Sequence, residues 1–173
     1  MNGDSGNDTV TGGAGADDLT GGSGADVLAG SGGNDTLRGD CHDSLLNFCD
    51  DAGDGFMGAV AAGAADTLDG GAGDDVLVGG AGADDLTGGT GSDLFVFEDV
   101  TEFGDLIRDF TAGAAGDRLL FNGLVRLAPG ATVASYVTLV QSGADTQVWL
   151  DRDAGGALAP ALVATLQNVT ATA

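Results

Sequence analysis

The sequence predicts an all-β fold: a parallel β-solenoid of two short-stranded sheets with an antiparallel β cap at its C-terminal end. Three observations lead to this prediction: a nine-residue repeat rich in glycine and aspartate, a formal net charge of -22, and a change of composition after Phe97. A nine-residue unit cannot bury its own apolar side chain, so successive units must stack on one another.

The repeat has Gly first, Gly fourth, Asp sixth and an apolar residue eighth, as in Gly12-Gly-Ala-Gly-Ala-Asp-Asp-Leu-Thr20. Its first six residues favour a turn, and its last three can extend as a strand with one inward side chain. Successive turns then lie alternately on opposite sides, with 18 residues per winding. The sixth-position acids are Asp8, Asp17, Asp26, Asp35, Asp66, Asp75, Asp84 and Asp93. The eighth-position core residues are Val10, Leu19, Leu28, Leu37, Leu68, Leu77, Leu86 and Phe95.

The charge excludes several classes of partner. The chain has 27 acidic residues against five arginines and no lysine, so it lacks the basic surface that nucleic acids and anionic membranes require. No apolar stretch is long enough for a membrane-spanning helix, and no basic-then-apolar leader follows Met1. We therefore expect no nucleic-acid partner, no membrane insertion and no cleavable N-terminal signal.

The stacked acids require a cation. One apolar side chain per strand contributes too little to order nine glycine-rich residues, and acids in register repel one another. Carboxylates and backbone carbonyls are hard ligands that suit Ca²⁺, whereas zinc and copper favour His and Cys, which the repeats lack. Mg²⁺ prefers rigid octahedral sites with several waters and is the weaker candidate.

The nine-residue repeats match G-G-x-G-x-D-x-U-x, and the chain therefore resembles the RTX (repeats-in-toxin, haemolysin-type) calcium-binding proteins. The resemblance implies a β-roll in which each ion lies between a turn and the second turn after it. The ligands would be the eight sixth-position aspartates and the backbone carbonyls of Gly3, Gly12, Gly21, Gly30, Gly70, Gly79 and Gly88. The clean pairs are Asp8 with Asp26, Asp17 with Asp35, Asp35 with Asp75, and Asp75 with Asp93. Two further pairs, Asp26 with Asp66 and Asp66 with Asp84, involve the degenerate repeat that ends in Asp66-Thr-Leu-Asp69. Four to six ions are therefore expected.

An insertion interrupts the repeat. Leu37 and Leu68 are 31 residues apart, which is nine plus 22, so one turn between Gly39 and Asp66 is predicted to be expanded by 22 residues. The insertion contains both cysteines and the single histidine: Cys41, Cys49 and His42. Four interpretations stay open: a zinc site, a reactive thiol beside His42, a Cys41–Cys49 disulfide in an extracellular protein, and an exposed insertion with a short helix capped by Ser44. The run from Asp50 to Gly55 is similar to the start of an EF-hand, but Ala52 and Ala61 occupy ligand positions and exclude that site.

The period stops after Phe97, and the chain is expected to divide there. Residues 1–97 would form the roll, with its inserted loop at 39–66, and residues 98–173 a capping β region. Phe95-Val-Phe97, Asp105–Phe110 and Asp117–Phe121 resemble the segment that follows the repeats in serralysin-like proteins. Strands are expected at 136–140, 146–150 and 162–166, the first two joined by a hairpin turn at 142–145. Asp105, Asp109 and Asp117 are candidates for a further ion at the junction of roll and cap, and Asp151 and Asp153 are weaker candidates.

The resemblance implies a calcium-binding module of a secreted, extracellular protein, which folds when it meets calcium after passing a type I secretion system. The alternative is a calcium-dependent adhesin or surface-layer module that uses the roll or the insertion for cell-surface contacts or self-association. Intrinsic catalysis is not expected, because one histidine and no lysine offer no Ser-His-Asp set and no phosphate loop. We expect the chain to be an excised C-terminal piece, whose parent protein has room for a separate catalytic domain.

Overall fold

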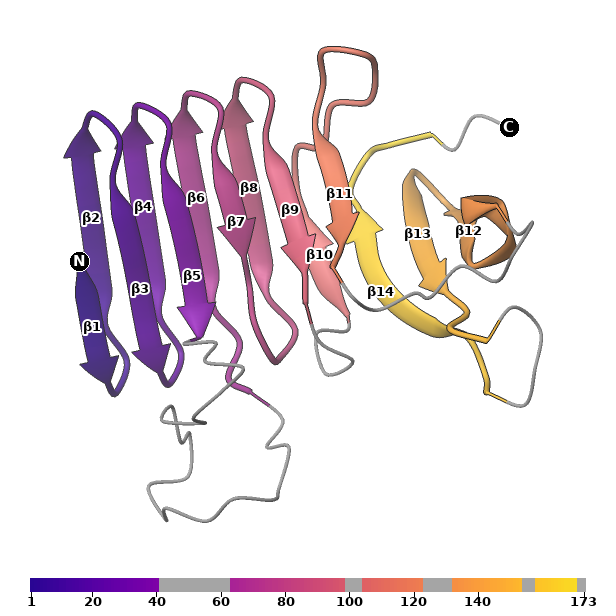
Figure 1. Cartoon of the computed structure of the whole chain (residues 1–173), viewed down its shortest axis with the longest axis horizontal. Coiled ribbons are helices and arrows are strands. Elements are labelled where there is room, and N and C mark those ends of the chain that lie inside the picture. The colour runs from indigo at the N-terminus through magenta and orange to yellow at the C-terminus, as the bar shows by residue number, and fades with distance from the viewer. Residues whose placement is uncertain (41–62, 99–103, 123–131, 154–157, 171–173) are drawn as a thin grey trace.

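The computed structural model describes residues 1–40, 63–98, 104–122, 132–153 and 158–170, and within them the fold is a two-sheet β-roll (Figure 1). Strands alternate between the sheets along the chain. The first sheet has the order β1 (Asn2–Ser5), β3 (Asp18–Ser23), β5 (Thr36–Asp40), β7 (Val76–Val78), β9 (Leu94–Phe97) and β11 (Arg118–Phe121). The second has the order β2 (Thr9–Ala14), β4 (Val27–Gly32), β6 (Thr67–Ala72), β8 (Asp85–Thr90), β10 (Asp105–Ile107), β14 (Ala161–Leu166), β13 (Asp145–Leu150) and β12 (Val137–Ser142). A short 3-10 helix, η1 (Val133–Ser135), precedes β12.

The core confirms the predicted nine-residue frame. In the first sheet Leu19 pairs with Leu37 and Leu37 with Leu77, so eighth-position side chains lie in one row across parallel strands. The leucines and Phe95 at this position are almost fully buried between the sheets. Val10 is only partly buried, because β2 is an edge strand with a neighbour on one side.

Several strands are longer than the three residues that the repeat predicts. In β2, β4, β6 and β8 the parallel pairing continues into the glycines that begin the next nine-residue repeat, as in Gly71↔Gly89. This extension requires glycine where the backbone turns to positive φ: Gly71 has φ 99°, and a side chain there would collide with the carbonyl of Ser31. The turns are therefore shorter and more tightly stacked than the sequence pattern alone indicates.

The 22-residue insertion leaves the stacking intact on both sides. At its start the backbone N–H of Asp40 donates to the carbonyl of Gly79 at 3.2 Å. After it, Thr67 returns to register with Val27 in β4 and Asp85 in β8. Cys41, His42 and Cys49 lie outside the described residues, as do the zinc, thiol, disulfide and helix interpretations that rest on them.

The C-terminal region continues the roll before it caps it. β10 and β11 pair in parallel with β8 and β9, although residues 98–122 lack the glycine repeat. Phe97 stacks on Phe121 with ring centroids 5.4 Å apart, and Arg108 forms an ion pair with Asp85 on the surface.

The antiparallel cap is found with one difference from prediction. β12, β13 and β14 form an antiparallel meander, and β12 and β13 are joined through Gly143 as expected. However, β14 pairs in parallel with β10, so the meander extends the second sheet instead of forming a separate sheet against the end of the roll. In the described ranges no helix is long and apolar enough to cross a membrane.

Candidate metal centres

The turns that connect the two sheets form two rows along opposite edges of the roll (Figure 1). We call the first the insertion row; it contains the turns of residues 3–8, 21–26, 39–66 and 79–84. We call the second the cap row; it contains the turns of residues 12–17, 30–35, 70–75 and 88–93, and it ends in the turn of residues 109–117. Each row holds four of the eight sixth-position aspartates.

Within each row, the aspartates are linked by a continuous ladder of hydrogen bonds. The backbone N–H of each aspartate donates to Oδ1 of the aspartate one full winding later. In the insertion row the bonds are Asp8→Asp26 (2.8 Å), Asp26→Asp66 (2.7 Å), Asp66→Asp84 (2.9 Å) and Asp84→Asp105 (3.0 Å). In the cap row they are Asp17→Asp35 (2.8 Å), Asp35→Asp75 (2.7 Å), Asp75→Asp93 (3.0 Å) and Asp93→Asp117 (2.9 Å). All six turn-to-turn pairs that the resemblance implied are thereby brought together, including the two through Asp66.

The second carboxylate oxygen is buried in several of these aspartates. In Asp8, Asp35, Asp75, Asp84 and Asp93, Oδ2 is buried and has no hydrogen-bond partner. A buried carboxylate oxygen without a donor is strongly destabilising, since desolvation of the charge is not compensated. The same uncompensated oxygen recurs at the same place in the repeat, which is what a row of cation sites requires.

Each of these oxygens lies against the first glycine of its own nine-residue repeat. A Cβ added to Gly70 would lie 2.5 Å from Oδ2 of Asp75 and 2.6 Å from the carbonyl oxygen of Gly88 in the next turn of the cap row. The seven glycines predicted from the sequence share this position: Gly3, Gly12, Gly21, Gly30, Gly70, Gly79 and Gly88. Any larger residue would fill the space between carboxylate and carbonyl, so the glycines keep that space open.

Gly39 is an eighth member of this set that the sequence prediction omitted. A Cβ on Gly39 would collide with both Oδ2 of Asp66 and the carbonyl oxygen of Gly79. The insertion places Asp66 27 positions after Gly39, so the sequence does not show directly that the two residues belong to the same repeat. The signal was present in the sequence, because Gly39 lies nine residues after Gly30.

The donor set fits calcium. Among the described residues, no three His, Cys, Asp or Glu side chains converge as a metal cluster, so a cation between turns must take much of its coordination from backbone carbonyls. A mixture of carboxylate and carbonyl oxygens is the ligand set of Ca²⁺, which takes six to eight oxygens in flexible geometry. Asp8, Asp35, Asp75, Asp84 and Asp93 are the described residues whose buried oxygens fit this group most directly.

The protonation of these carboxyls reflects the same burial. Burial, followed by the repulsion of Asp105, raises the pKa of Asp84 to about 8. Burial also raises the pKa of Asp93 to about 6, with Asp117 as the strongest repelling neighbour and the backbone N–H of Asp75 opposing the shift. The pKa of Asp75 is raised by burial as well. A proton on these carboxyls would therefore occupy the oxygens that a cation would use.

The three junction acids have different surroundings. Asp105 continues the insertion row through the N–H of Asp84. Asp117 continues the cap row, and Asp109 accepts the N–H groups of Gly88 and Gly89.

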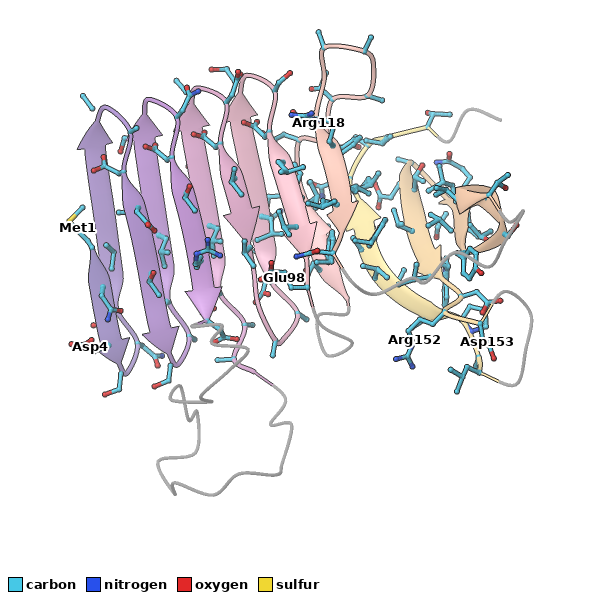
Figure 2. The ribbon with its side chains drawn as sticks, in the orientation of Figure 1. Met1, Asp4, Glu98, Arg118, Arg152 and Asp153 are labelled. Atoms are coloured by element: carbon cyan, nitrogen blue, oxygen red, sulfur yellow. The ribbon has the colours of Figure 1, made fainter. Side chains whose placement is uncertain are left out.

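The weaker candidates, Asp151 and Asp153, form a turn of their own: the N–H of Asp153 donates to Oδ1 of Asp151 at 3.1 Å. Figure 2 shows Asp153 in the C-terminal region, distant from both turn rows.

The sequence comparison identifies the repeat. The family model of the RTX calcium-binding nonapeptide repeat, in four copies, matches residues 2–40 and 61–95. A comparison with curated proteins finds no match.

Solved structures with a similar course of the chain include the AlgE6R2 and AlgE6R3 subunits of the Azotobacter vinelandii mannuronan C5-epimerase. AlgE6R2 is 23% identical with a TM-score of 0.40, covering 96% of this chain and 84% of that one. AlgE6R3 is 25% identical with a TM-score of 0.36, covering 95% and 71%. The extracellular lipase LipA from Serratia marcescens is 20% identical with a TM-score of 0.34, covering 95% of this chain and 36% of the lipase.

Proposed function

Residues 2–40 and 61–95 of this chain are RTX calcium-binding nonapeptide repeats, and from that premise we propose that the chain is a calcium-dependent folding module of a secreted protein. The observation that supports this most is the recurrence of a buried Oδ2 without a hydrogen-bond partner, as in Asp35, Asp75 and Asp93, next to a glycine that keeps the space beside it open. Calcium binding then contributes directly to the free energy of folding.

The proposed ligands are the eight sixth-position aspartates and the backbone carbonyls of the first glycines, with Gly39 added to the seven predicted ones. Each row has three consecutive pairs of repeat turns, which makes six sites at most. Two of these involve the turn of residues 39–66, so we propose four to six ions. Asp105 is the candidate ligand at the end of the insertion row.

The charge of the chain supports the coupling of folding to calcium. A net charge of -22 repels itself in the compact state, and the ladder places carboxylates of successive turns next to one another. Where calcium is scarce, this repulsion keeps the chain unfolded, which suits passage through a secretion channel. Where calcium is abundant, as outside the cell, the ions neutralise the rows and the roll forms. We propose export by a type I system and an extracellular location on this basis.

We also propose that the module itself is non-catalytic, since its organised acids are committed to turn rows along the edges of the roll. Any catalytic activity would belong to a separate domain of a longer parent protein.

The division into a roll at 1–97, with an insertion between 39 and 66, and a capping region at 98–173 is likewise a proposal. The loss of the glycine repeat after Phe97 supports it. β10 and β11, in contrast, carry both sheets past this point before the antiparallel meander begins.

A calcium titration followed by far-ultraviolet circular dichroism tests the folding proposal. The chain in chelator should lack β structure, gain it on addition of Ca²⁺, and fail to gain it with equal Mg²⁺, which is reluctant to give up its waters. A chain that is equally β-rich and equally heat-stable in chelator would contradict the proposal.

A second candidate is a calcium-dependent adhesin or surface-layer module. The placement of the insertion favours it, because Asp40 and Asp66 keep both ends of the segment in register with the neighbouring turns. The roll would then display residues 41–62 towards a cell surface or another copy of the chain. Glycan and cell-surface binding, measured in calcium with and without residues 41–62, separates the two functions: binding that disappears with the segment supports the adhesin.

A further inference from the structure

The cap row and the insertion row differ in how much of their structure depends on a cation. We infer that the cap row fills at lower calcium concentrations than the insertion row, because a ladder of fifth-position side chains, which the alanines of the insertion row cannot form, connects its turns to one another and to residues 109–117. This inference rests on the proposed function, since it concerns the same calcium sites.

The last turn of the cap row, residues 109–117, is closed by backbone amides. Oδ1 of Asp117 accepts the N–H of Asp93 at 2.9 Å, as in every repeat, but its Oδ2 accepts the N–H of Thr111 at 2.7 Å. The N–H of Asp117 in turn donates to the carbonyl of Thr111 at 2.8 Å. In Asp35 and Asp75 the equivalent Oδ2 is buried without a donor. The Thr111 amide therefore satisfies the oxygen that needs a cation in the repeats.

Asp109 attaches this turn to the last repeat. Its Oδ1 accepts the N–H of Gly88 at 3.0 Å and its Oδ2 the N–H of Gly89 at 2.8 Å. Gly88 and Gly89 are the first two residues of the turn that carries Asp93. Both carboxylate oxygens of Asp109 and of Asp117 thus accept backbone amides, which makes residues 109–117 a template for the turn of residues 88–93.

A second ladder runs along the cap row at the fifth position of the repeat. The N–H of Asp74 donates to Oδ1 of Asn34 at 3.1 Å, and the N–H of Ser92 donates to Oδ1 of Asp74 at 2.9 Å. Ser92 Oγ then donates to the carbonyl of Ala115 at 2.6 Å, within the turn of residues 109–117. This outer ladder connects three consecutive repeat turns to the template.

The insertion row cannot build the same ladder. Its fifth positions after the first turn are Ala25, Ala65 and Ala83, and a methyl side chain accepts no hydrogen bond. Outside the aspartate ladder, the N–H of Ala25 donates to Oδ1 of Asn7 at 3.3 Å, and the N–H of Ala81 donates to Oδ2 of Asp40 at 3.0 Å. These two bonds join separate pairs of turns and form no continuous ladder among the described residues. The row also has to hold together the two ends of the turn of residues 39–66.

The difference sets the order of binding. The additional hydrogen bonds of the cap row form when its turns stack, so they add to the free energy of folding that is coupled to calcium binding and tighten binding in that row. The net contribution of one hydrogen bond corresponds to about two- to tenfold in an equilibrium constant. We expect the calcium midpoints of the two rows to differ by at least that factor.

Hydrogen–deuterium exchange of the full chain at stepped calcium concentrations measures the order directly. Peptides that cover residues 30–35, 70–75 and 88–93 should gain protection at lower calcium than peptides that cover 21–26 and 79–84. Simultaneous protection of both rows would overturn this inference and leave calcium-dependent folding standing. Absence of any calcium-induced protection would overturn the proposed function itself.

Three substitutions test the cause of the difference. Ser92→Ala removes the link to Ala115 and should raise the calcium midpoint of the cap row, whereas the matched variant Asn7→Ala should leave that midpoint unchanged. Ala65→Asn provides an amide oxygen for the N–H of Ala83, as Asp74 does for Ser92, and should lower the midpoint of the insertion row. Unchanged midpoints in both Ser92→Ala and Ala65→Asn, with the saturated spectra intact, would show that the outer ladder does not order the sites.

Discussion

The backbone N–H of Asp35 donates to Oδ1 of Asp75 at 2.7 Å, although 40 positions of sequence separate the two residues. The bond has the same form as the one between Asp17 and Asp35, which are 18 positions apart. One winding of the roll is therefore structurally equivalent to the next even where 22 additional residues leave and rejoin it.

Removing Asp35 and Asp75 should impair the calcium response far more than removing two acids of the cap. Asp35→Ala and Asp75→Ala delete a proposed ligand and a buried acceptor at the centre of the cap row. Hydrogen bonds to charged groups contribute roughly 1.5–3 kcal/mol, so the calcium midpoint should rise by about tenfold or more. Circular dichroism titration measures it, with Asp151→Ala and Asp153→Ala as the acidic control pair. Equal effects of the two pairs would contradict the assignment of the ligands.

Gly70→Ala should weaken calcium binding by filling a site. The new Cβ would lie 2.5 Å from Oδ2 of Asp75 and 2.6 Å from the carbonyl oxygen of Gly88. Gly32→Ala is the matched control in the same row, since a Cβ at Gly32 meets nothing within 4 Å. Isothermal titration calorimetry should show a lower affinity or the loss of an ion for Gly70→Ala alone. Identical isotherms for the two variants would place the cation elsewhere.

The calcium midpoint should fall as pH rises from about 5 to 8. Burial raises the pKa of Asp84 to about 8 and of Asp93 to about 6, above the usual value of about 4 for an aspartate. For the metal-free roll, this shift contributes stability that is present below about pH 4 and is lost as pH rises through 6 and 8. Calcium needs the ionised carboxylates, so it binds more tightly at the higher pH. Titrations at pH 5, 6.5 and 8 check the direction, and a midpoint independent of pH would contradict it.

Leu28→Ala should destabilise the calcium-saturated roll by about 2–5 kcal/mol, because Leu28 is fully buried in the core between the two sheets. Its neighbour Val27 is 45% exposed on the outer face, and Val27→Ala should cost far less. Denaturant unfolding in saturating calcium measures both. A similar loss for the two variants would show that the alternation of inner and outer side chains is not as described.

Most of the roll could be predicted from the repeat. A single period of nine permits one parallel register, so the core positions follow once the nine-residue repeats are aligned. The pairing of Asp8 with Asp26 and of Asp75 with Asp93 follows from the same alignment. Gly39 was missed because its partner Asp66 lies beyond the insertion. The extension of strands into glycines such as Gly71 was missed as well, since it depends on positive φ combined with a close neighbouring carbonyl.

The cap shows where the pattern no longer predicts structure. The hairpin around Gly143 was expected from local turn residues, but the parallel pairing of β14 with β10 joins segments with no shared period. The different surroundings of Asp109 and Asp117 also depend on amides of distant residues, Gly88, Gly89 and Asp93, and on the nearby amide of Thr111.

The repeat predicts the period, the alternation of two turn rows, the apolar core and the need for a hard cation, because each follows from residue type at a fixed spacing. Which carboxylate oxygens keep no hydrogen-bond donor depends on the tertiary structure. An Oδ2 atom is satisfied or not according to the amide opposite it, as the contrast between Asp117 and Asp75 shows. That amide is supplied by the fold, so residues of the same type at similar places in successive windings acquire different chemistry.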